Sequence, residues 1–218
     1  MQGSAVEVPV GTVVLQGDLQ VPERAAGVVV FAHGSGSGRH SPRNRFVADV
    51  LTRAGLCTLL LDLLTPDEEA IRDSVFDIEL LAARLTAATV WLGSRPETAS
   101  CRVGYFGAST EPGAALEAAA DAGRRIWAVM SRGGRPDLAG RRLTQVRSPT
   151  LLIVGSRDTT VLELNRQAQA RLHCANRLTI IDGATHLFEE PGTLAQAAMH
   201  ARDWFLDHLP TTGVAPPG

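Results

Sequence analysis

The chain has 218 residues and a formal charge of −2, and all 21 of its basic residues are arginines. The lack of lysine excludes chemistries that need its amine, such as Schiff bases, pyridoxal phosphate enzymes and phosphate-binding P-loops. The near-neutral charge and 5% aromatic content argue against nucleic-acid binding, which typically uses a basic surface with stacking rings.

The cysteines and the N-terminal segment indicate the compartment. Cys57, Cys101 and Cys174 are far apart and lack C-x-x-C spacing, so neither a disulfide framework nor a metal site is predicted. The N-terminal segment MQGSAVEVPVG resembles no secretion signal, and no apolar run is long enough to cross a membrane. We therefore expect a cytoplasmic protein that does not bind membranes, as a monomer or homodimer.

Apolar runs typical of strands alternate with helical stretches along the chain. The predicted strands are Val6–Val10, Thr12–Val21, Val28–Ala32, Leu56–Leu61, Arg102–Phe106, Ile126–Met130, Leu151–Val154 and Leu178–Ile181. The predicted helices are Arg45–Ala54, Asp67–Trp91, Pro112–Ala122, Val161–His173 and Thr193–His208. In the second helix we expect one apolar face of Phe76, Leu80, Ala83, Ala87 and Val90.

This order predicts one α/β domain over residues 1–210, followed by a flexible tail at 211–218. Its sheet is expected to have about eight mostly parallel strands, with helices on both faces. The irregular segment 131–148 is too short to form a cap domain. Because ligands bind at the carboxyl ends of such strands, the residues after each apolar run are the candidate site.

A glycine-rich segment, HGSGSGRHSP, starts at His33 after the third predicted strand. It permits two interpretations. In a dinucleotide-binding protein such a loop opens a helix and an acidic residue, here Asp62, follows about 20 residues later, but the third fingerprint glycine is missing. In a hydrolase, a His-Gly loop donates a backbone N–H, here from Ser35, to a developing oxyanion.

A second candidate position is Ser109, in the stretch GASTEP between a predicted strand and an Ala-rich helix. A serine in a sharp turn between strand and helix is the setting of a hydrolase nucleophile. The N–H of Thr110 would then serve as a second oxyanion donor at the helix N-terminus. A serine that merely caps the helix would fit the same pattern.

The next two positions favour the hydrolase interpretation. Asp158 follows the penultimate predicted strand, and His186 follows the last one. The chain order Ser, Asp, His matches the triad order of hydrolases on this kind of sheet. His186 would take the proton of Ser109, and Asp158 would hold the imidazole in the right tautomer. This mechanism requires no cofactor.

The stretches AHGSGSGRHSPRN, GYFGAST, SRGGRPDLAG, LLIVGSRD and DGATHLFEE resemble the α/β-hydrolase superfamily, more narrowly its dienelactone-hydrolase-like family. The resemblance extends from about residue 5 to residue 209, and is to hydrolases sometimes fused to phosphoribosyltransferases. It implies hydrolysis of small esters, lactones or related acyl compounds by Ser109, Asp158 and His186. Dienelactone hydrolases carry a cysteine nucleophile where this chain has Ser109, so their particular substrate is not carried over.

Glu111 departs from the G-x-S-x-G pattern, because it replaces the last glycine. We expect Glu111 to turn outward in the first helical turn, where a negative charge suits the helix dipole. The alternative is that Glu111 distorts the turn, which would leave a weak enzyme or a catalytically silent binding protein of the same fold.

Arginines near the predicted site are either solvated surface residues or anion-binding groups. Arg39 and Arg132 are the first candidates to bind an anionic part of the substrate, because a guanidinium can bind a carboxylate through two bonds. The residues expected to contact the small-molecule substrate are His33, Gly34, Arg39, His40, Glu111 and Arg132.

Overall fold

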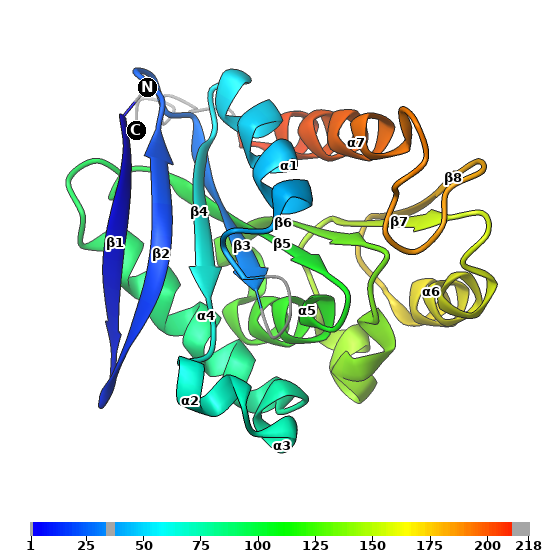
Figure 1. Cartoon of the computed structure of the whole chain (residues 1–218), viewed down its shortest axis with the longest axis horizontal. Helices are drawn as coiled ribbons and strands as arrows, with labels where there is room; N and C mark the ends of the chain where they lie inside the picture. The colour runs from blue at the N-terminus through cyan, green and yellow to red at the C-terminus, as the bar shows by residue number, and fades with distance from the viewer. Residues whose placement is uncertain (1, 34–37, 211–218) are drawn as a thin grey trace, which may run out of the picture.

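The computed structural model describes residues 2–33 and 38–210 (Figure 1). These residues form an eight-stranded sheet in the order β1-β2-β4-β3-β5-β6-β7-β8. The strands are β1 (Gln2–Val10), β2 (Val13–Val21), β3 (Gly27–His33), β4 (Cys57–Asp62), β5 (Arg102–Ala108), β6 (Ile126–Arg132), β7 (Thr150–Gly155) and β8 (Asn176–Ile181). β1 and β2 are antiparallel to their neighbours, and all the other pairs are parallel. The expected fold class is confirmed.

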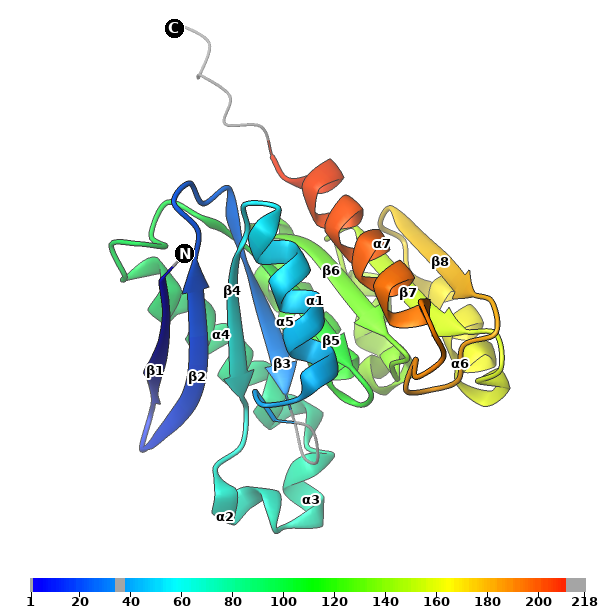
Figure 2. The same ribbon diagram turned by 45° about the horizontal axis from the view of Figure 1, so that its top comes forward.

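Helices cover both faces of the sheet. The α-helices are α1 (Pro42–Arg53), α2 (Pro66–Glu69), α3 (Arg72–Val75), α4 (Ile78–Gly93), α5 (Glu111–Ala122), α6 (Thr159–Arg171) and α7 (Thr193–His208), and the short 3₁₀ segments are η1 (Gly123–Arg125) and η2 (Pro136–Gln145). Figure 2 shows α1 and α7 side by side on one face, while α4, α5 and α6 lie behind the sheet. The apolar side chains of each face form a separate core cluster.

The single helix predicted over Asp67–Trp91 is wrong, because the chain there forms α2, α3 and α4 in succession. A side-chain cap marks one of the two breaks, that between α3 and α4, whereas Ile71, which precedes α3, makes no side-chain cap bond. Thr65 and Glu68 form a reciprocal capping box that begins α2, and the Asp77 carboxylate accepts the N–H of Leu80 to begin α4.

The apolar face predicted for this region is also wrong. Phe76 and Val90 are 52% and 71% exposed. The buried face of α4 instead includes Leu81, Leu85, Ala88 and Leu92. Since these positions are also three or four residues apart, the periodicity alone fits both faces, and packing against the sheet decides between them.

The polar positions predicted from the sequence gather at the carboxyl edge of the parallel strands. β3, β5 and β6 are neighbours in the sheet, and every residue of β3, β6 and β7 is buried. Among the described residues, no inserted domain covers this edge; η2 packs beside α5 and α6 instead. Gly34, Ser35 and the tail 211–218 lie outside the described residues.

Candidate active site

Ser109 lies in a tight turn between β5 and α5. Its φ of 62° is in the left-handed region, which residues with side chains rarely adopt. The turn is so compact that a Cβ on Gly107 would lie 2.7 Å from the backbone nitrogen of Pro112. The local structure is therefore the strand, sharp turn and helix that the sequence predicts, and it lifts Ser109 above the end of β5.

The Asp158 and His186 side chains meet at the same edge of the sheet. His186 Nδ1 lies 2.7 Å from Asp158 Oδ2. The His186 side chain is 44% exposed, whereas that of Asp158 is 13% exposed. The loop after β7, which carries Asp158, packs closely against the loop after β8, which carries His186. A Cβ on Gly155 would overlap the carbonyl of Ala184. This arrangement leaves Nε2 as the ring nitrogen available for proton transfer.

The segment after β6 links the turn at Ser109 to the loop of His186. The N–H of Arg135 donates to the carbonyl of Ser109 at 2.7 Å. Two residues earlier, a Cβ on Gly133 would lie 3.1 Å from the carbonyl oxygen of His186. Ser109 and His186 therefore both lie beside the segment from Gly133 to Arg135, although they are 77 positions apart in the chain.

Of the two predicted oxyanion donors, one can be described. Thr110 is the N-cap of α5, so its N–H belongs to the helix end, where the peptide dipoles favour negative charge. Ser35, the other predicted donor, and the neighbouring Gly34 lie outside the described residues.

Glu111 does not turn outward, so this prediction is wrong. The residue is only 4% exposed, and its Oε1 accepts the Thr110 hydroxyl at 3.1 Å. The physical reason is a buried cation: Arg132 is 7% exposed, and the Glu111 carboxylate stabilises its charged form. Glu111 therefore faces the interior beside the Ser109 turn.

Arg132 lies at the end of β6 and bonds to a buried asparagine. Its Nη2 donates to Asn44 Oδ1 at 3.1 Å, and Asn44 Nδ2 lies 2.9 Å from His33 Nδ1. The guanidinium lies over the rings of Phe106 and Phe188, at 5.8 and 5.9 Å from their centroids. Burial, together with repulsion by Arg43, lowers the pKa of Arg132 to about 10, so the group stays charged at neutral pH.

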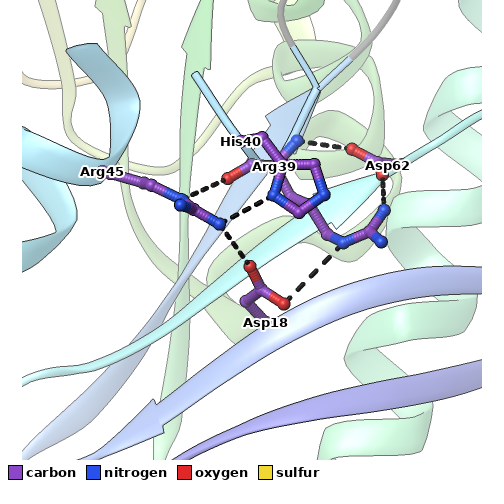
Figure 3. Close-up of polar contacts among 5 residues, drawn as sticks. All are labelled: Asp18, Arg39, His40, Arg45 and Asp62. Atoms are coloured by element: carbon purple, nitrogen blue, oxygen red, sulfur yellow. Dashed lines mark hydrogen bonds and ion pairs between the residues drawn. The ribbon is translucent and has the colours of Figure 1, made fainter. Parts of the chain in front are cut away.

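Arg39 and His40 belong to a different group of side chains, shown in Figure 3. Asp62 accepts the backbone N–H of Arg39 at 2.6 Å and forms an ion pair with its guanidinium, while Arg39 Nε lies 3.7 Å from Asp18. Arg45 contacts Asp18 at 3.2 Å and His40 Nδ1 at 2.7 Å. Arg39 is thus already engaged by two carboxylates, whereas Arg132 packs close to the Ser109 turn.

Sequence reasoning did not identify Asn44 or Glu190 as residues of the site. Asn44 lies in the first turn of α1, and Glu190 Oε2 accepts the N–H of Thr185 at 3.1 Å, next to His186. Neither residue carries a local signal, because each acts through a folded neighbour. Only their positions at the ends of two resembling stretches, AHGSGSGRHSPRN for Asn44 and DGATHLFEE for Glu190, could have drawn attention to them.

His33 makes folding stability depend on pH. Burial and the nearby Arg132 charge lower its pKa from 6.5 to about 3, so below pH 6.5 the unfolded chain binds a proton that the folded protein excludes. Stability should therefore fall as the pH drops, by about 2 kcal/mol between pH 7.5 and 5. Urea unfolding at the two pH values should show this loss in the wild type and not in His33→Gln. An exposed histidine, His200, provides the control: His200→Gln should keep the wild-type dependence, and an unchanged dependence in His33→Gln would contradict the assignment.

A crystal structure of a dienelactone hydrolase from Anabaena variabilis is similar to this chain over nearly its full length. The two are 55% identical in sequence and superpose with a TM-score of 0.92, and the match covers 96% of this chain and 99% of the other. This chain belongs to the dienelactone hydrolase family. A lidless α/β serine hydrolase from Xanthomonas campestris, 17% identical with a TM-score of 0.77, shares the fold over 97% of both chains.

The curated relatives of this member of the dienelactone hydrolase family are longer proteins than the chain itself. Proteins named "putative phosphoribosyl transferase" from two strains of Mycobacterium tuberculosis are 62% identical over 209 residues. The match covers 96% of this chain but 47% of each relative, so the chain spans about half their length. No protein-family profile matches the chain. Within the described residues, no helix is long and apolar enough to span a membrane.

Proposed function

We propose that this chain is a serine hydrolase that cleaves small esters, lactones or related acyl compounds through an acyl-enzyme intermediate. The observation that supports this most is the pairing of His186 Nδ1 with Asp158 Oδ2 at 2.7 Å, at the sheet edge where Ser109 occupies a strained turn. Membership of a hydrolase family supports the same reaction class.

The first half-reaction forms the acyl-enzyme. Ser109 Oγ attacks the substrate carbonyl carbon while His186 Nε2 takes the hydroxyl proton, and Asp158 stabilises the resulting imidazolium. The tetrahedral oxyanion accepts the N–H of Thr110 and, as the sequence predicts, that of Ser35. The intermediate then collapses, the bond to the leaving oxygen breaks, and His186 gives its proton to that oxygen.

The second half-reaction restores the enzyme. His186 removes a proton from a water molecule, whose oxygen attacks the acyl carbon; the bond to Ser109 Oγ then breaks and the proton passes to Ser109. With the edge of the sheet lacking an inserted domain in the described residues, we expect small substrates that enter from solvent.

Labelling with a fluorophosphonate, followed by peptide mapping, tests this proposal. Phosphonylation should occur at Ser109 in the wild type and disappear in Ser109→Ala. The matched control is Ser156→Ala, which changes a serine in the loop after β7 whose hydroxyl accepts the N–H of Gly183, and which should label normally. No labelling of a folded wild-type protein would favour a silent binding protein instead, with the buried Glu111 carboxylate beside the nucleophile as the first cause to examine.

A further inference from the structure

A chain of three buried polar side chains spans the end of the strand that carries Ser109. His33 ends β3, Asn44 lies in the first turn of α1, and Arg132 ends β6; they are 2%, 1% and 7% exposed. β5 lies between β3 and β6 in the sheet, and its last residue, Ala108, pairs with Arg132. The three side chains therefore connect the two strands that flank the Ser109 turn.

The contact between Arg132 and Asn44 fixes the orientation of the Asn44 amide. A guanidinium has only donors, so the Asn44 oxygen must face Arg132. The Asn44 amide nitrogen then faces His33 and donates to Nδ1, which must be unprotonated to accept. A neutral His33 therefore carries its proton on Nε2.

The charges around His33 favour this neutral form. Burial and the Arg132 cation lower its pKa to about 3. Two further charged groups face these three side chains. Arg43 on α1 lowers the pKa of Arg132, and Glu111 on α5 raises it. Asp62 is level with His33 in the neighbouring strand, but its carboxylate is engaged by Arg39.

Two buried donors at the ends of this chain make no hydrogen bond in the described structure. They are His33 Nε2 and Arg132 Nη1. A buried donor without a partner costs free energy, so hydrophobic packing would be the more stable choice at these positions. The arrangement thus calls for an explanation other than stability.

We infer that Arg132 and Asn44 are positioning residues that hold His33 in its Nε2–H tautomer and tie the end of β3 to the end of β6, on either side of Ser109. His33 leads directly into the segment where the sequence predicts the oxyanion donor Ser35. Phe188, in the loop of His186, packs against the same guanidinium. The effect of this positioning on catalysis rests on the proposed function. The assignment of the His33 tautomer is independent of that function.

Nitrogen NMR of ¹⁵N-labelled protein tests the tautomer directly in the wild type. The His33 signals, assigned by their loss in His33→Gln, should show a protonated Nε2 and an unprotonated Nδ1 at pH 7. In Arg132→Met, the Asn44 amide can turn its oxygen toward His33, so the Nδ1–H form should become populated. The control is Arg102→Met, an exposed arginine at the opposite end of β5, which should leave the tautomer unchanged. A protonated Nδ1 in the wild type would overturn the inference, as would an unaltered tautomer in a folded Arg132→Met.

Asn44→Asp provides a second test. A carboxylate accepts from both neighbours, so it should place the proton on His33 Nδ1 and raise the titration midpoint of His33 by about 2 pH units. A midpoint that does not move would contradict the inference. This measurement requires no activity, so it remains decisive if Ser109 fails to react with the fluorophosphonate.

Kinetics test the positioning role. Arg132→Met should lower kcat about 10- to 100-fold, with KM changed less than about threefold, because misplaced groups affect the transition state more than substrate binding. Arg132→Lys, which can still donate to Asn44, should recover part of the loss. A large rise in KM at constant kcat would instead assign Arg132 to substrate binding and overturn the positioning role.

Discussion

Replacing Asp158 with Asn should lower kcat about 10⁴-fold with little change in KM. The amide is similar in size, so the loops after β7 and β8 can keep their positions. However, the amide can donate to His186 Nδ1, which places the imidazole proton on Nε2. His186 then cannot accept the proton of Ser109, and the amide cannot stabilise an imidazolium. The rate of ester hydrolysis at pH 7 to 8 would measure the effect.

The neighbouring residue Asp182 offers a matched control. It follows β8, is exposed and accepts one bond from the Ser156 hydroxyl at 3.3 Å. Asp182→Asn therefore makes the same chemical change near His186 without touching its ring, and should keep at least half of the wild-type kcat. Ser109→Ala sets the lower limit of activity. An Asp158→Asn enzyme within tenfold of the wild type would contradict the role proposed for Asp158.

The sequence was sufficient to predict the sheet and the positions at its carboxyl edge. Buried strands such as Val28–Ala32 are continuous apolar runs, and the chain order of Ser109, Asp158 and His186 restricts how they can meet on a parallel sheet. The contact between His186 and Asp158 then follows from the positions of two strand ends. Helix boundaries were less predictable, because the Asp77 cap that begins α4 and the break before α3, where Ile71 makes no side-chain cap bond, interrupt one helical pattern.

The buried charges could not be predicted in the same way. Arg132 is the last residue of β6 and Glu111 is the first of α5, and at such ends a charged side chain is normally directed to solvent. The residue that binds Arg132 is Asn44, 88 positions earlier in the chain. Since such a contact exists only after folding, no local pattern around Arg132 or Glu111 indicates burial.

The buried position of Glu111 predicts that restoring the usual glycine will not activate the enzyme. Glu111→Gly should raise kcat less than threefold and lower stability by about 2 to 4 kcal/mol, because it leaves the buried Arg132 cation without its facing carboxylate. Glu111→Gln, which retains the size of the side chain, should lose a similar amount of stability. Urea unfolding at pH 7 measures both variants, and Glu117→Gln, which changes a half-buried glutamate on the same helix, is the control.

A double-mutant cycle separates loss of charge from loss of packing. If Glu111 is held inside by Arg132, the combination of Glu111→Gln with Arg132→Met should cost less than the sum of the single changes, by about 1 to 3 kcal/mol. The reason is that the second substitution removes the cation that the first one leaves unpaired, and an apolar side chain can take its place beside Phe106 and Phe188. Strictly additive losses would mean that Glu111 is buried for packing alone. In that case Glu111→Gly would be the variant in which to look for a gain in kcat.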